Sequence, residues 1–277
     1  MTARPAATRS GPAAPALEIT GLTVRHPGTP PAVDGVSLRL AAGAALTLVG
    51  ESGSGKTTLA RAVLALPAPG TTTTGSVRVD GTDLSGLGAR ELSRIRGRRI
   101  GYVPQDPTTS LDPLRRIGSQ ITEVLLRHRA APGRRAARAA VPAVLARAGL
   151  TDPHRIARSR PHELSGGQRQ RAAIALAVCC GPRLLVADEP TTALDPLLRV
   201  RILDLFTALR TETGLALLLI THDLAAARRI GGTVAVLRAG RIAETGPAAD
   251  VLHRPSHPYT ADLARLPAVA ADPGARP

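Results

Sequence analysis

The sequence contains very few aromatic residues, only two cysteines and a single lysine. Tryptophan is absent, and Tyr102, Phe206 and Tyr259 are the only aromatic side chains among 277 residues. Proteins that read RNA or single-stranded nucleic acid stack bases on aromatic rings, so this shortage argues against that class of function. The adjacent Cys179 and Cys180 lack the spacing of a disulfide framework or a zinc site, which indicates a reducing compartment. Because no run of about 18 apolar residues occurs, we expect a chain that does not itself span a membrane.

The charge is strongly positive and comes almost entirely from arginine. The chain has 36 basic and 21 acidic residues, a formal net charge of +15, and every basic residue except Lys56 is arginine. Two interpretations remain open: the coding bias of a genome rich in Ala, Arg, Gly and Pro codons, or contact with anionic lipid or another polyanion. The same alternatives, a solvated face or a partner contact, apply to the Arg/Ala-rich stretch Arg129–Ala140.

The order of apolar patterns predicts an α/β core with an inserted helical subdomain. Residues 1–16, rich in Ala, Pro and Thr, are expected to form a disordered arm. Strands are predicted at Leu17–Val24, Val36–Leu40, Ala45–Val49, Ser76–Asp80, Ile100–Val103, Leu184–Ala187, Leu215–Ile220 and Val234–Leu237. Helices are predicted at Ile117–Arg127, Val141–Ala148 (with Pro142 in its first turn), Gly166–Cys180 and Pro196–Arg210. The helical subdomain covers about residues 107–181.

A phosphate-binding loop follows the predicted strand Ala45–Val49. Its sequence, Gly50-Glu51-Ser52-Gly53-Ser54-Gly55-Lys56-Thr57, fits the pattern G-x-x-x-x-G-K-[ST], and a helix is predicted from Thr58. The glycines let backbone N–H groups converge on phosphates, Lys56 supplies a mobile positive charge, and Thr57 offers a hydroxyl to Mg²⁺. The only lysine of the chain therefore stands where a planar guanidinium would not do the same work.

Two further segments are suited to a nucleotide site. The strand Leu184–Ala187 ends in Asp188, positioned to hold Mg²⁺, and Glu189, positioned to orient and deprotonate an attacking water. Upstream lie Ser165, Gly166, Gly167 and Gln168, where Ser165 is a plausible N-cap and the glycines expose N–H groups to an anion. Taken singly, two acids at a strand end are more often a solvated turn, and a Ser-Gly-Gly run is equally compatible with a loop.

Together, these segments resemble the nucleotide-binding subunit of an ATP-binding cassette (ABC) transporter. The resemblance covers about residues 17–250 and adds Gln105 as the Q-loop residue that touches Mg²⁺, Asp195 in the D-loop Ala193-Leu194-Asp195, and His222 as the switch histidine. It implies a P-loop NTPase (RecA-like) core, an antiparallel β subdomain and the inserted helical subdomain. It also implies ATP and Mg²⁺ as cofactors, Glu189, His222 and Gln105 as catalytic residues, and Thr58 among the nucleotide contacts.

The resemblance further implies a head-to-tail dimer. Each ATP would lie between the loop around Lys56 of one subunit and Ser165–Gln168 of the other. The family usually stacks adenine on an aromatic residue before the lysine loop, but the segment Arg25–Gly28 offers only His26. His26 is therefore the candidate for adenine, with a surface-loop histidine as the alternative.

Two stretches resemble dipeptide, oligopeptide and nickel importers. They are Gln105–Pro113, followed by Ile117–Ile121, and the motif His257-Pro258-Tyr259-Thr260 within the expected tail 251–277. This resemblance implies two transmembrane permease subunits, a second homologous ATPase and, indirectly, an extracytoplasmic solute-binding protein. The chain would lie at the cytoplasmic face of the membrane and would bind no specific nucleic acid. The alternative is an ABC-type ATPase that acts on nucleic acid or the ribosome.

Overall fold

A parallel sheet carries the phosphate-binding loop at its centre. The computed structural model describes residues 14–192 and 194–265. The six-stranded sheet has the order β10-β9-β3-β8-β7-β6, with all neighbours parallel except β9 and β10. Its strands are β3 (Ala45–Val49), β6 (Ile100–Val103), β7 (Leu184–Asp188), β8 (Ala216–Thr221), β9 (Thr233–Arg238) and β10 (Arg241–Pro247).

Helices cover both faces of this sheet, and the strand sequences reflect that. In β8, Leu217 and Leu219 pack with helix α7 (Pro196–Thr213), whereas Leu218 and Ile220 belong to the cluster that contains helix α1 (Lys56–Val63). Because successive side chains of a strand point to opposite faces, a strand covered on both sides is apolar throughout. The short runs of consecutive apolar residues were therefore a correct signal for buried parallel strands.

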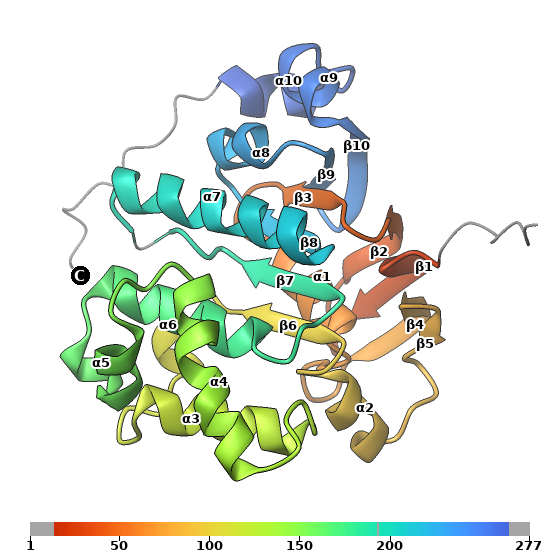
Figure 1. The fold of residues 1–277 in the computed structure, drawn as a ribbon. Helices are drawn as coiled ribbons and strands as arrows, with labels where there is room; N and C mark the ends of the chain where they lie inside the picture. Colours follow the sequence, from red (N-terminus) through yellow and green to blue (C-terminus); the bar gives the residue numbers. More distant parts are fainter. Residues whose placement is uncertain (1–13, 193, 266–277) are drawn as a thin grey trace, which may run out of the picture.

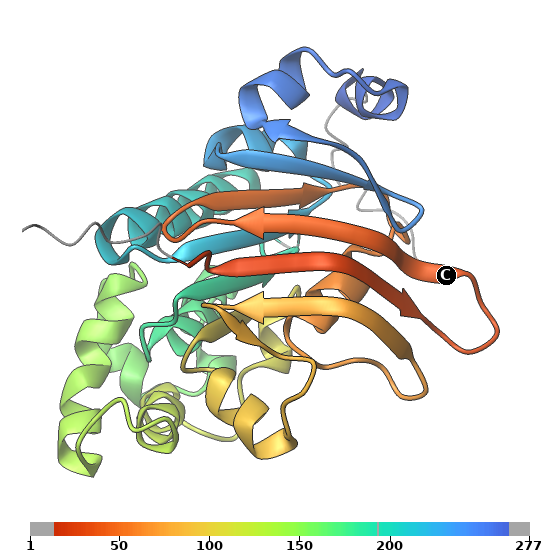
Figure 2. The same cartoon turned by 90° about the vertical axis from the view of Figure 1, so that its right-hand side faces the viewer.

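A second, antiparallel sheet lies against the first layer (Figure 2). Its order is β2-β1-β4-β5, with β1 at Leu17–Arg25, β2 at Pro31–Leu40, β4 at Thr72–Val79 and β5 at Thr82–Asp83. Buried residues of β1 and β2, such as Leu22 and Leu38, share one apolar cluster with Leu59 of α1. The loop that precedes α1 is thus held between two sheets.

The inserted helical block lies at one end of the molecule, and the last helices lie at the other (Figure 1). Between β6 and β7 run the 3₁₀ turns Pro107–Thr109 and Pro161–Glu163 and the helices α3 (Ile117–Arg127), α4 (Arg134–Arg147), α5 (Pro153–Arg158) and α6 (Gly166–Val178). The block has its own apolar core, which includes Ile121, Leu145 and Ile156. The remaining helices are α2 (Ala89–Ile95), α8 (Leu224–Ile230), α9 (Ala248–His253) and α10 (Pro258–Arg265).

The predicted fold class is confirmed, and several boundaries differ. Helix α4 begins at Arg134, so Pro142 lies inside it and not in its first turn. Alanine and arginine are strong helix formers, and the buried Ala137 packs in the block's core, which extends the helix past the residues that apolar spacing indicates. Strands β2 and β4 begin earlier than predicted because Pro31 and Thr72 both pair with Arg25 of β1.

Two expected domain boundaries fall inside ordered structure. Most of the expected arm, residues 1–13, lies outside the described residues, but Ala16 is buried and its carbonyl accepts a hydrogen bond from the Asp80 N–H. The expected boundary between residues 250 and 251 falls inside α9. None of the helices in residues 14–192 and 194–265 is long and apolar enough to cross a bilayer.

Candidate functional site

The segment Gly50–Thr57 connects β3 to α1 at the carboxyl edge of the sheet. Strand β3 lies between β8 and β9, so the loop emerges from the middle of the sheet. Helix α1 begins at Lys56, two residues before the predicted start, and Gly55 caps it with φ of 106°. A side chain at Gly55 would collide with the carbonyl of Ala32, so only glycine allows this approach.

Lys56 is the buried centre of the loop. Only 7% of it is exposed, and its Nζ donates hydrogen bonds of 2.7 Å to the carbonyls of Gly50 and Glu51. Burial lowers the pKa of the Lys56 ammonium, while the carboxylates of Glu189, Asp188 and Glu51 act in the opposite direction. The loop therefore wraps around a positive charge that interacts with Glu51 of the loop itself and with the two carboxylates at the end of β7.

Asp188 ends strand β7 with one unsatisfied carboxylate oxygen. It is 4% exposed, and its Oδ1 has no hydrogen-bond partner among the described residues; neither has the buried Oγ of Ser54 in the loop. Burial, and next the charge of Glu189, raise the pKa of Asp188. Open oxygens of this kind are the donors that hard divalent cations take, and hydroxyls such as that of Thr57 complete such sites. The residues present therefore fit a bound Mg²⁺.

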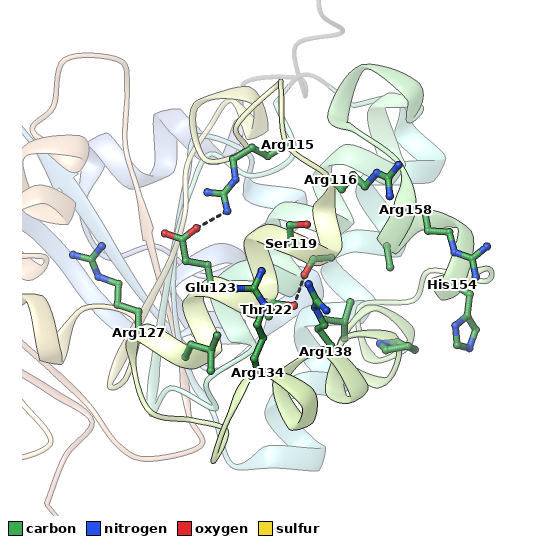
Figure 3. A pocket seen from close by; sticks show the side chains of 15 residues that line it. Arg115, Arg116, Ser119, Thr122, Glu123, Arg127, Arg134, Arg138, His154 and Arg158 are labelled. Atoms are coloured by element: carbon green, nitrogen blue, oxygen red, sulfur yellow. Dashed lines mark hydrogen bonds and ion pairs between the residues drawn. The ribbon is translucent and has the colours of Figure 1, made fainter.

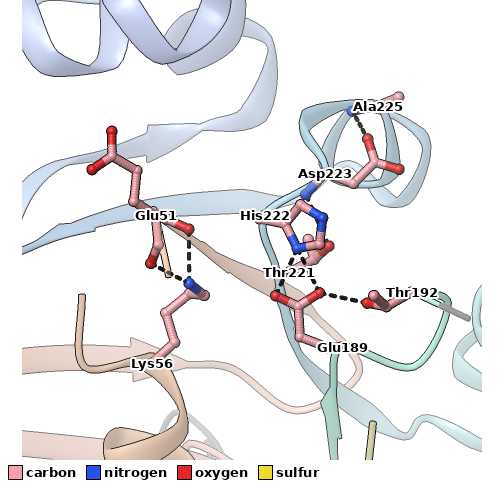
Figure 4. A network of polar contacts seen from close by, with 9 residues as sticks. Glu51, Lys56, Glu189, Thr192, Thr221, His222, Asp223 and Ala225 are labelled. Carbon is pink, nitrogen blue, oxygen red and sulfur yellow. Dashed lines mark hydrogen bonds and ion pairs between the residues drawn. The ribbon is translucent and has the colours of Figure 1, made fainter. Parts of the chain in front are cut away.

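Glu189 holds a strained and well-defined position (Figure 4). Its φ of 49° lies in the left-handed region, which costs a non-glycine residue about 1–2 kcal/mol. Its Oε1 and Oε2 lie 2.9 Å and 2.8 Å from Nδ1 of His222, and Oε2 also accepts a hydrogen bond of 2.9 Å from Thr192 Oγ1. His222 and Thr192 therefore hold the carboxylate at both oxygens. A strained backbone that the surroundings maintain in this way is typical of functional sites.

A cavity of 520 Å³ brings together nine of the predicted residues, from the loop and from three strand ends. Its lining contains Ser52, Gly53, Gly55, Lys56, Thr57, Thr58, Gln105, Glu189 and His222, all predicted, and Ala32, which was not. Ala32 lies on β2 and reaches the site only through the contact between the two sheets. Nothing in the linear sequence could have singled it out.

Other predicted residues lie apart from this cavity. Ser165 caps α6, where its Oγ accepts from the Gln168 N–H, as predicted, but none of Ser165, Gly166, Gly167 and Gln168 lines the cavity. Asp195 caps α7 by accepting from the Leu198 N–H at 2.9 Å. Ala193 of the D-loop lies outside the described residues. His26 lines a separate recess of 20 Å³, which shares only Thr58 with the cavity.

A contact that the sequence did not indicate joins the loop to the end of the chain. The hydroxyl of Tyr259 in α10 accepts a hydrogen bond of 3.3 Å from the backbone N–H of Glu51. Tyr259 stood out only as part of the motif His257–Thr260 and as one of two tyrosines. Its position beside the loop follows from how α10 packs.

A second hollow of 950 Å³ lies on the helical block, between α3, α4 and α5 (Figure 3). Six arginines line it: Arg115, Arg116, Arg127, Arg134, Arg138 and Arg158. Glu123 is the only acidic residue in its lining and pairs with Arg115. The hollow is a concentrated source of positive potential and contains none of the predicted site residues.

A comparison with known protein families also identifies this region of the chain as a nucleotide-binding cassette. Residues 33–192 match the family described as ABC transporter. The chain belongs to the ABC transporter family. The match covers β2 from Val33 onward, the phosphate-binding loop, the helical block and Asp188–Glu189, so it contains most of the residues that line the cavity.

Curated ABC relatives carry names of peptide transport. A putative peptide import ATP-binding protein of Brucella melitensis is 45% identical over 241 residues, covering 84% of this chain and 71% of the relative. The dipeptide transport ATP-binding protein DppD of Bacillus subtilis is 41% identical over 238 residues, covering 85% and 71%. The oligopeptide transport ATP-binding protein OppD of Mycobacterium tuberculosis is 43% identical over 252 residues, covering 90% of this chain. This chain spans only 41% of the length of that mycobacterial relative.

Solved cassettes share the fold. A dimeric ATP-binding cassette in a post-hydrolysis state, bound to ADP and Pi, superposes with a TM-score of 0.73 at 30% identity, covering 84% of this chain and 98% of that chain. The cbiO1 structure from Clostridium perfringens reaches a TM-score of 0.76 at 24% identity, covering 87% of this chain and 91% of that chain, and supports the fold alone.

Proposed function

We propose that this chain is the ATP-binding and ATP-hydrolysing subunit of an importer that takes up peptides. One observation carries the proposal: a single cavity brings together Lys56 and Thr57 of the loop with Glu189 and His222 from the adjacent strand ends. The names of the curated relatives support peptides as the solute. Nickel or other metal chelates are the second solute class, on the motif resemblance alone.

Each residue has a distinct task in this proposal. The loop N–H groups and the Lys56 ammonium would bind the phosphates of ATP, and Asp188, Thr57 and Gln105 would hold Mg²⁺, which neutralises phosphate charge when bound. The Glu189 carboxylate would orient the attacking water and take up its proton. His222 and Thr192, which contact Glu189, keep that carboxylate aimed into the cavity.

The proposed active unit is a dimer. Ser165–Gln168 form a capped helix start that does not line the cavity of their own chain, which supports their use by a second subunit. A helix N-terminus carries about half a positive charge, so it favours phosphate strongly only where closure excludes water. Association should therefore depend on ATP. A second, homologous ATPase is the proposed partner.

The proposed membrane partners are two permease subunits, supplied with solute by an extracytoplasmic binding protein. A groove of 330 Å³ supports a contact with a permease helix, because it lies between the end of α1 and helices α3 and α6. Leu66, 47% exposed, is one of the residues that line it. We propose that the chain lies at the cytoplasmic face of the membrane, bound to these permeases.

The test combines two variants with recovery from native membranes. Glu189→Gln should keep ATP bound, slow hydrolysis by about 10²-fold or more, and trap a dimer on size exclusion with ATP. Lys56→Ala, the matched control, should abolish nucleotide binding and dimer formation. Hydrolysis by Glu189→Gln at the parental rate would contradict the role of Glu189.

The same variant identifies the partners. Affinity purification of the Glu189→Gln chain from native membranes with ATP should recover two permeases and a second ATPase. Recovery of ribosomes or nucleic acid instead would favour the alternative ATPase function, for which the arginine-lined hollow is the supporting observation.

A further inference from the structure

The C-terminal motif contacts the phosphate-binding loop directly. The Tyr259 hydroxyl accepts a hydrogen bond from the Glu51 N–H across 208 positions of sequence. We propose that Tyr259 is a positioning residue for the loop, and that the docking of the segment Ser256–Arg265 sets the affinity of the site for nucleotide. This inference rests on the proposed function, since it assigns a residue to the same ATP site.

One peptide unit explains how Tyr259 would act. The N–H of Glu51 and the carbonyl of Gly50 belong to the same planar peptide. Tyr259 holds that peptide at its N–H, and the Lys56 ammonium is bound at its carbonyl, 2.7 Å away. A plane restrained at both ends cannot rotate, so the tyrosine fixes the carbonyl that orients Lys56. Without the hydroxyl, rotation of the peptide would carry that carbonyl away from the ammonium.

The tyrosine itself is firmly placed. It is 7% exposed and packs in an apolar cluster with Val49, the last residue of β3, and with Val236 of β9. The guanidinium of Arg238 covers its ring at 4.8 Å from the ring centre, a cation–π arrangement. The hydroxyl is therefore presented to the loop by a rigid ring.

The segment before Tyr259 is anchored by one carboxylate. Glu244 of β10 accepts hydrogen bonds of 2.8 Å from the Ser256 N–H and 3.1 Å from the His257 N–H. The Tyr259 N–H in turn donates to His257 Nδ1 at 3.1 Å. The chain thus connects β10, the motif and the loop through a continuous series of hydrogen bonds. Tyr259 does not line the cavity, so it would act only through the loop.

The test removes a single oxygen atom. In Tyr259→Phe, we expect the Kd for a non-hydrolysable Mg–ATP analogue, measured by titration calorimetry, to rise about three- to tenfold, the value of one hydrogen bond. The KM for ATP should rise in step, with kcat at saturating ATP within about twofold. Thr207→Val is the control, because it also removes a single hydrogen-bonding hydroxyl, which donates to the Leu203 carbonyl within α7, and Thr207 does not line the cavity.

A second variant tests the anchor without touching the ring. Glu244→Gln should weaken the docking of Ser256 and His257 and raise the same Kd by a smaller factor. An unchanged Kd in Tyr259→Phe, with or without a lower melting temperature, would overturn the inference, as would a fall in kcat at constant KM. Failure of the parental chain to bind the analogue would instead refute the proposed function, so the two failures are distinguishable.

Discussion

Asp188 is a single residue whose buried charge lowers the stability of the folded protein at neutral pH. Its folded pKa is raised, first by burial and then by the charge of Glu189. The folded state therefore favours the protonated carboxyl. That stabilisation is complete below the ordinary aspartate pKa of about 3.9 and is lost as the pH rises through the folded pKa. At neutral pH the ionised carboxylate is destabilising unless a cation neutralises it.

We therefore expect Asp188→Asn to raise the melting temperature of the nucleotide-free protein at pH 7.5 in a chelator. A neutral amide avoids both the burial cost and the repulsion from Glu189, and in a domain of this size about 1 kcal/mol corresponds to roughly 2–4 °C. Differential scanning fluorimetry measures the difference in melting temperature. This difference should become smaller at lower pH, where the Asp188 carboxyl is increasingly protonated. The exposed Asp204, paired with Arg229, supplies the control Asp204→Asn. A lower melting temperature for Asp188→Asn would contradict this account.

Most residues of the site were predictable because their chemistry is local. A phosphate loop needs glycine, lysine and a hydroxyl at fixed spacing, and the pattern Gly50–Thr57 contains them all. Ala32 and Tyr259 were not predictable, since they come to the loop from β2 and α10 by packing. The role of His26 at adenine remains a prediction.

At the scale of elements, the stretch Ile117–Ile121, which resembles peptide and nickel importers, also stabilises the fold. Gln120 of α3 is 6% exposed, and its side-chain amide accepts from the Asp112 N–H and donates to the carbonyls of Asp112 and Arg115. It braces the loop that leads from the Q-loop segment into the helical block. The residues after Gln105 are therefore constrained by the fold as well as by any partner.

Gln120→Met should lower the free energy of unfolding by about 1–3 kcal/mol, because three backbone groups lose their partner while volume is kept. Urea denaturation followed by circular dichroism measures the change. Its exposed neighbour supplies the control Ser119→Ala, which should stay within about 0.5 kcal/mol of the parent. Since Gln120 does not line the cavity, the Kd for the ATP analogue should not change. If Gln120→Met raised the Kd for the ATP analogue as much as Tyr259→Phe is expected to, the bracing role would be refuted.

At the scale of the whole molecule, the charge of +15 is the largest unexplained feature. The hollow between α3, α4 and α5 concentrates six arginines around one acid. A surface of this kind attracts any polyanion at low salt, and affinity falls steeply as counterions compete. Charge alone therefore does not define a nucleic-acid function.

We expect DNA and RNA to bind at about 20 mM salt and to be released near 150 mM, without sequence preference. Fluorescence anisotropy over a salt series checks this. Replacing Arg134 and Arg138 by glutamine should weaken the low-salt binding, whereas the same change at Arg94 and Arg254, outside the hollow, should weaken it less. Tight, sequence-dependent binding at 150 mM salt would support the alternative ATPase on nucleic acid.

The sequence by itself determined the fold class, the phosphate loop and the strand-end acids. These features depend on hydrophobic periodicity and on residue types at short, fixed spacing. Tertiary structure alone decided the rest. It placed the Ala32 carbonyl against Gly55, and it buried Asp188 Oδ1 without a hydrogen-bond partner among the described residues. It also left Ser165–Gln168 outside the cavity of their own chain. It also decided that Tyr259 restrains the loop. The physical reason is that burial and contacts between distant segments arise only when sheets and helices pack.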